Sequence, residues 1–159
     1  MEISFNSIKP HNSRVNRKLM RSAIRFYANE LMHSNLVKNL SVHVKYVRDL
    51  TKNDKVYAYC DYDQSGEKPR DFTFELDPSI GKRLTLVTLA HEMYHVKQYA
   101  TGELKDYLKM SNKVRWQGQK IDYDVEEYNR DGDDYPFEQE AIKGEEALYY
   151  KFKNSEYYM

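Results

Sequence analysis

The pentapeptide His91 to His95, which reads His-Glu-Met-Tyr-His, lies inside a strongly apolar stretch that runs from Leu84 to Tyr99. On a helix, side chains at positions i and i+4 lie on the same face, so His91 and His95 can direct two imidazole nitrogens at one point. Apolar residues surround the pair, namely Leu84, Leu86, Val87, Leu89, Ala90, Met93 and Val96. The pattern predicts a buried helix that holds two histidines in the protein core.

Two histidines on successive turns of one helix supply half of a zinc site. Glu92 follows the first of them, and a glutamate in that position can take a proton from a metal-bound water. The alternative interpretation is a buried helix whose histidines only form hydrogen bonds with their neighbours. The complete pattern on a plausible helix favours the metal site.

A catalytic zinc has three protein ligands and keeps a fourth position for water, so a third ligand is needed. No histidine follows His95, which leaves a carboxylate, a sulfur or one of the upstream histidines, His11, His33 and His43. The strongest candidate is Glu138 in a helix predicted from Pro136 to about Lys153, because proline suits the first helical position. Glu138 shares a helical face with Ala141, Ile142, Leu148, Tyr149 and Phe152.

A carboxylate on an apolar face is costly to bury unless a cation accompanies it, and zinc would be that cation. Glu138 could instead be a first-turn glutamate that stabilises the helix dipole. Glu140 is the alternative ligand, although it lines up with a mostly polar face of the same helix.

The pattern His91-Glu-x-x-His95 followed by Glu138-x-x-Ala141 resembles the gluzincin arrangement of zinc metallopeptidases. The local sequence is also similar to small phage-type SprT-like metallopeptidases, over Leu84 to Tyr99, Trp116-Gln117-Gly118 and Pro136 to Ala141. Phe137 stands where those proteins usually have tryptophan. The third histidine that ends the site of SprT proteins is absent, and the resemblance is specific over residues 84–141.

This resemblance implies a zincin-like peptidase fold with zinc on His91, His95 and Glu138 and with Glu92 as general base. It also implies that the strand before the active helix, Asp71 to Leu76, pairs with extended substrate; an ordinary sheet edge is the alternative. A donor for the oxyanion is also required, and the candidates are Tyr94, Tyr123, Tyr128 and Tyr135. Gln98, three residues after His95, could orient that imidazole.

The whole chain is predicted to be one α+β domain, residues 1–159, because this length suits a single core. We expect a helix from Ser13 to about Asn39, three short strands, the His-Glu helix ending near Gly102, and the C-terminal helix. The strands are indicated by alternation at Val42 to Tyr46, Val56 to Tyr62 and Phe72 to Leu76. Residues 103–135 are either a functional loop or a helix that the pattern conceals.

Composition limits the partners and the compartment. The 25 basic and 25 acidic side chains give no net charge, but residues 1–56 hold eleven Lys or Arg against four Asp or Glu, a balance of +7. Residues 122–146 hold two against eleven, a balance of −9. The single cysteine, Cys60, cannot form an internal disulfide, and no secretory signal or membrane span is visible, so the expected location is cytoplasmic.

A rival hypothesis is a catalytically weak zinc protein that acts as a nucleic-acid- or protein-binding module. Arg14, Lys18, Arg21 and Arg25 fall on one face of the first helix, with Arg17 beside them. Such a row could follow phosphates, but a basic row opposite an apolar one is more often a solvated helix face. The presence of Glu92 favours the peptidase, whose partner would be a protein or peptide substrate, because a structural zinc site needs no base.

Overall fold

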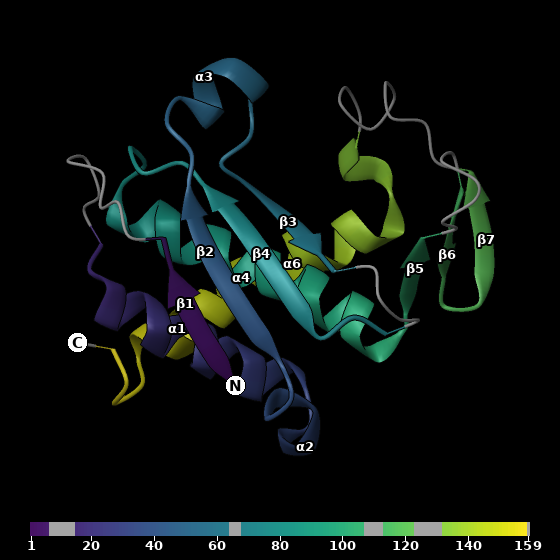
Figure 1. Ribbon diagram of the computed structural model, residues 1–159, viewed down its shortest axis with the longest axis horizontal. Helices are drawn as coiled ribbons and strands as arrows, with labels where there is room; N and C mark the ends of the chain where they lie inside the picture. Colours follow the sequence, from purple (N-terminus) through teal and green to yellow (C-terminus); the bar gives the residue numbers. More distant parts are fainter. Residues whose placement is uncertain (7–14, 64–67, 107–112, 123–131, 159) are drawn as a thin grey trace.

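The structure of the 159-residue chain is a computed structural model that describes residues 1–6, 15–63, 68–106, 113–122 and 132–158. Within these residues it is a mixed α+β fold with two sheets. The larger sheet lies in front of three long helices in Figure 1, and the smaller sheet lies at one side. No helix in the described residues is long and apolar enough to cross a membrane.

The larger sheet has the strand order β1-β2-β4-β3. Its strands are β1 (Glu2–Phe5), β2 (Ser41–Tyr46), β4 (Asp71–Leu76) and β3 (Ala58–Tyr62). The first three are parallel, and β3 is antiparallel to β4. Alternation places Val42, Val44 and Phe74 in the buried core, while polar side chains occupy the other face.

Two predictions about this sheet are wrong. A fourth strand, β1, was not predicted, because four residues are too few to establish a period of two. The segment Asp71 to Leu76 is also not a sheet edge, since β4 is hydrogen-bonded to β2 on one side and to β3 on the other. Its main-chain groups are therefore already paired, and β3 is the edge strand on that side of the sheet.

The predicted N-terminal helix is two helices, α1 (Arg17–Leu31) and α2 (Ser34–Val37). Ser13 lies outside the described residues, and the cap of α1 is Asn16, whose Oδ1 accepts a hydrogen bond of 2.7 Å from the N–H of Leu19. The chain becomes extended at Met32, and Nδ1 of His33 caps α2. The apolar spacing continues from α1 into α2, but the cap at His33 starts a separate helix and so divides the predicted one in two.

The two helices that carry the predicted ligands have the expected bounds. Helix α4 (Lys82–Thr101) ends at Gly102, whose φ of 81° is easily adopted by glycine. Helix α6 (Pro136–Lys153) begins at the predicted proline. Ile142, however, is 36 % exposed rather than buried, because it lies at the edge of the apolar stripe of α6.

The described parts of residues 103–135 are mainly strands, whereas the sequence left a loop or a concealed helix as the alternatives. They form an antiparallel sheet of β5 (Leu104–Asp106), β6 (Lys113–Trp116) and β7 (Gln119–Asp122), followed by the 3-10 helix η1 (Gly132–Asp134). Gln117 and Gly118, both with positive φ, connect β6 to β7 in the manner of a two-residue hairpin loop. A small apolar cluster of Leu104, Val114 and Phe137 joins this sheet to the start of α6.

Asp77 is a buried carboxylate that ties the short helix α3 (Leu50–Asp54) to the turn before α4. It accepts hydrogen bonds from the N–H of Thr51 at 2.9 Å and from the N–H and hydroxyl of Ser79 at 2.8 and 2.6 Å. Burial raises the pKa of Asp77, but the hydrogen bonds from Ser79 and Thr51 outweigh it and lower the pKa to about 2.

Asp77→Asn is expected to lower the free energy of unfolding at neutral pH by about 2 kcal/mol, because hydrogen bonds to a charged acceptor are lost. The folded pKa is below the ordinary value of 3.8, so this stability is present above pH 3.8 and is lost as the pH falls through about 2. Urea unfolding across this range should therefore show a shallower pH dependence in Asp77→Asn than in wild type. The exposed Asp122→Asn variant is the control, and a parallel loss in both variants would contradict the assignment.

Candidate metal centre

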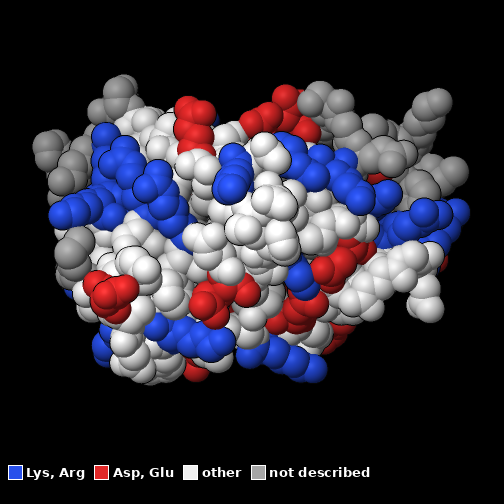
Figure 2. Space-filling model, turned by 90° about the horizontal axis from the view of Figure 1, so that it is seen from below, with Lys and Arg blue, Asp and Glu red and all other residues white. Residues whose placement is uncertain are grey.

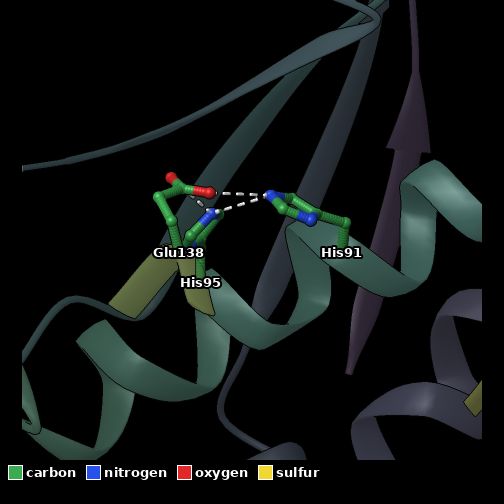
Figure 3. A group of neighbouring side chains, drawn as sticks. All are labelled: His91, His95 and Glu138. Atoms are coloured by element: carbon green, nitrogen blue, oxygen red, sulfur yellow. Dashed lines mark hydrogen bonds and ion pairs between the residues drawn. The ribbon is translucent and has the colours of Figure 1, made fainter. Parts of the chain in front are cut away.

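Three predicted ligands meet where the first turn of α6 packs on α4. His91 and His95 come from α4, Glu138 comes from α6, and their candidate ligand atoms all lie within 4.8 Å of one another. Figure 3 shows the two imidazoles and the carboxylate directed at a common point. The Nε2 atoms of the histidines are 3.2 Å apart, and each lies 3.1 Å from an oxygen of Glu138.

The other nitrogen of each imidazole is held by an acceptor. Nδ1 of His91 lies 2.7 Å from Oε2 of Glu145, and Nδ1 of His95 lies 2.8 Å from Oε1 of Gln98. The amide nitrogen of Gln98 donates to the carbonyl of Phe137 at 2.8 Å and to Glu140 at 3.2 Å, which turns its oxygen toward His95. Since carboxylate and amide oxygens only accept, each Nδ1 carries a proton, and each neutral imidazole keeps a lone pair on Nε2.

Two lone pairs and a carboxylate therefore converge on one point, and a positive charge is needed between them. When no metal is bound, protonation of a histidine provides this charge. Burial lowers the pKa of both histidines, but hydrogen bonds with Glu138 outweigh this effect and raise the pKa of each. Burial likewise raises the pKa of Glu138, and the histidines more than reverse that rise. Two imidazole nitrogens and one carboxylate are a donor set that Zn²⁺ takes, so the residues fit this ion.

Glu92 lies beside this group on α4 and is only 6 % exposed. Burial raises its pKa; the neighbouring His95 and His91 act in the opposite direction, and the net pKa stays above the ordinary value. Within the described part of the chain, no side chain or N–H donates a hydrogen bond to Glu92. The carboxylate is thus a stronger proton acceptor than an ordinary surface glutamate.

Two further groups belong to the surroundings rather than to the ligand set. Glu140, the alternative third ligand, is directed at Lys97, whose Nζ is 3.1 Å away, and at Gln98. Cys60 on β3 is half-buried; desolvation raises the pKa of its thiol, and the charges of nearby Glu92 and Glu138 act in the same direction. Neither Glu140 nor Cys60 is part of the ligand group that the described residues form.

The described residues do not identify the oxyanion donor among the predicted tyrosines. The hydroxyl of Tyr94 lies against α6, where a Cβ added to Gly144 would be only 2.0 Å from the phenolic oxygen. Tyr135 is stacked on Phe137, with ring centroids 5.4 Å apart and planes inclined by 13°. Tyr123 and Tyr128 lie outside the described residues.

The hydrogen bonds to Nδ1 are expected to contribute to metal affinity, because they fix the direction of each Nε2 lone pair. Gln98→Ala and Glu145→Ala should each weaken zinc binding by about ten- to a hundredfold. Competition with a chromogenic chelator measures the affinity, and Gln119→Ala on β7 is the control because Gln119 is exposed. Unchanged affinity in a folded Gln98→Ala variant would show that packing alone orients His95.

Sequence reasoning named the three residues that the structure brings together, His91, His95 and Glu138, and suggested Gln98, but it missed Glu145, which contacts His91. The signal for Glu145 was its position seven residues, or two helical turns, after Glu138 on the predicted helix, which places both carboxylates on the same face. Comparison with known proteins found no matching family model, no matching curated protein and no matching solved structure.

Proposed function

We propose that the protein is a zinc-dependent peptidase in which His91, His95 and Glu138 hold the ion and Glu92 is the general base. The observation that carries the proposal is that the two Nε2 atoms and the Glu138 carboxylate converge on one point while each Nδ1 is held by an acceptor. Among the described residues, no fourth His, Cys, Asp or Glu joins the group. Three protein ligands with a position left for water are typical of catalytic zinc, whereas structural zinc usually has four.

The chemistry of each side chain suggests its role in the proposed reaction. A bound zinc would lower the pKa of a coordinated water and polarise the carbonyl of a peptide bond. Glu92 would accept the proton of the attacking water and deliver it to the leaving amine. Glu145 and Gln98 would keep the imidazoles in the tautomer with the proton on Nδ1, so that Nε2 remains a ligand.

An extended substrate would lie along the outer edge of β3, and not along β4 as the sequence resemblance implied. Strand β3 pairs with β4 on one side only, and it packs against α4, which carries His91 and His95. An edge strand offers main-chain donors and acceptors to an incoming peptide. An edge strand that packs against the helix with the two histidines is what we would expect of a zincin-like peptidase, and this supports the proposal.

The first test is metal content together with cleavage. Protein purified without added metal should contain about one zinc per chain, because three donors and a water complete a tetrahedral site. It should cleave a fluorescently labelled unfolded protein, cleavage should stop with a chelator, and added zinc should restore it. Protein that contains no zinc and takes up none on dialysis would contradict the metal site.

The second candidate function is a zinc-binding module without catalysis, and the same experiment distinguishes it. Stoichiometric zinc without cleavage of any unfolded protein would support the module. Glu92 favours the peptidase, because burying a carboxylate that accepts no hydrogen bond from the described residues costs stability, and a zinc-binding module would not need such a base.

A further inference from the structure

A row of cationic side chains lies on the exposed face of α1, outside the candidate metal centre. Lys18, Arg21 and Arg25 are exposed, and Arg17 is half-buried. Residues three and four positions apart are neighbours on a helix surface, so these side chains form one continuous row. Figure 2 looks onto this side of the molecule and shows blue atoms gathered at the left, where α1 lies in Figure 1.

These four cations have no acidic partner in the described part of the chain. Some cations elsewhere do have one: Arg83 pairs with Glu146 at 3.1 Å, Lys151 with Glu30 at 3.3 Å and the half-buried Lys113 with Asp122 at 3.4 Å. Unlike those cations, the α1 row keeps its charge uncompensated.

Phe5 of β1 and the chain beside it hold part of the row in place. The guanidinium carbons of Arg17 and Arg21 lie 5.5 and 4.9 Å from the centre of the Phe5 ring. Nη2 of Arg17 also donates a 2.7 Å hydrogen bond to the carbonyl of Asn6. Two of the four cations therefore have a fixed position before any partner arrives, which reduces the entropy lost on binding.

The row acts against the stability of the helix that carries it. Like charges three or four residues apart repel each other, as Lys18 and Arg21 or Arg21 and Arg25 do. Arg17 and Lys18 also lie in the first turn, which has no acidic residue, although the helix dipole favours negative charge there. Apart from the contacts of Arg17 and Arg21 with Phe5 and Asn6, folding gains nothing from this arrangement, and an anionic partner would turn the repulsion into attraction.

We propose that this face of α1 binds the phosphate backbone of double-stranded nucleic acid, independently of the metal site. Successive cations are roughly 5 Å apart along the helix axis, so several can neutralise neighbouring phosphates together.

The composition of the helix favours double-stranded nucleic acid over the rival partners. None of the exposed large apolar side chains among the described residues belongs to α1, so the helix itself supplies no anchor for a membrane or for a protein partner. It also carries no exposed aromatic ring on which the bases of a single strand could stack; the exposed Tyr157 contacts α1 at Ser22 and Phe26, to one side of the row.

The test is fluorescence anisotropy with a labelled duplex of about 20 base pairs, titrated at several salt concentrations starting near 50 mM. The triple variant Lys18→Gln, Arg21→Gln, Arg25→Gln should bind at least tenfold more weakly, and its log–log salt slope should fall by about three. The matched control is Arg83→Gln, Lys113→Gln, Lys151→Gln, which removes the same charge from paired positions. The control should bind within about twofold of wild type.

Three results would overturn the proposal: no binding by wild type at low salt, an equal loss in both triple variants, or displacement of the duplex by polyglutamate as readily as by unlabelled duplex. The last of these would indicate an acidic protein partner instead. Thermal melting of both variants checks the fold, and the α1 variant should melt close to wild type because the relief of repulsion within the helix offsets the lost contact of Arg21 with Phe5. Zinc content should be equal in all three proteins, which keeps this test separate from that of the peptidase.

Discussion

Glu92→Gln is expected to reduce the rate of peptide-bond cleavage by about 10²- to 10⁴-fold. The amide has the shape of the carboxylate but cannot accept a proton from water. Because Glu92 lies outside the ligand group, zinc content should not change. Burial already raises the pKa of this carboxyl, so a neutral amide should leave the melting temperature equal to or above that of wild type.

The measurement is the initial rate of cleavage of a labelled unfolded protein at saturating zinc. Glu146→Gln serves as the matched control, because it makes the same chemical change at an exposed position of α6. A Glu92→Gln variant that cleaves as fast as the parent would show that the proposed base is wrong, even if the metal site is right.

The second large effect concerns the ligands themselves. His91→Ala and His95→Ala should abolish zinc binding, Glu138→Ala should weaken it severely, and Glu140→Ala should retain it, because Glu140 is directed at Lys97. Zinc per chain after gel filtration measures this directly. Loss of zinc in Glu140→Ala together with full zinc in Glu138→Ala would show that the other carboxylate is the ligand.

Stability gives an independent measure of the same site. A ligand bound only by the native state stabilises it by about 4 kcal/mol when its free concentration is a thousand times its dissociation constant. Chelation should therefore lower the melting temperature by several degrees, and Cys60→Ser should show the same shift because Cys60 is outside the ligand group. A melting curve indifferent to chelator would indicate that the histidines only stabilise a buried helix.

The parts of the site that could be predicted depend on local periodicity. His91 and His95 share a helix face by their spacing alone, and Pro136 together with the apolar stripe of α6 indicated that Glu138 points inward. Gln98 was within reach of prediction for the same reason, since it is three residues from His95 on one helix.

The features that were missed depend on how distant segments meet. Glu145 reaches His91 across 54 residues, so its role depends on how α6 crosses α4, which no local pattern specifies. The position of β4 between β2 and β3 is likewise a property of the sheet, not of the segment Asp71–Leu76. The strands of the second sheet have only three or four residues each, too few for a clear alternation.

The dependence of the centre on α6 has a consequence for protein synthesis. Helix α4 can form as soon as it leaves the ribosome, but it supplies only His91 and His95, and Glu138 is made 43 residues after His95. Gln98 also lacks its contact with the carbonyl of Phe137 until α6 docks. A nascent chain would therefore retain metal weakly, and the proposed peptidase activity would arise only after α6 has emerged, which limits damage to other unfinished chains nearby.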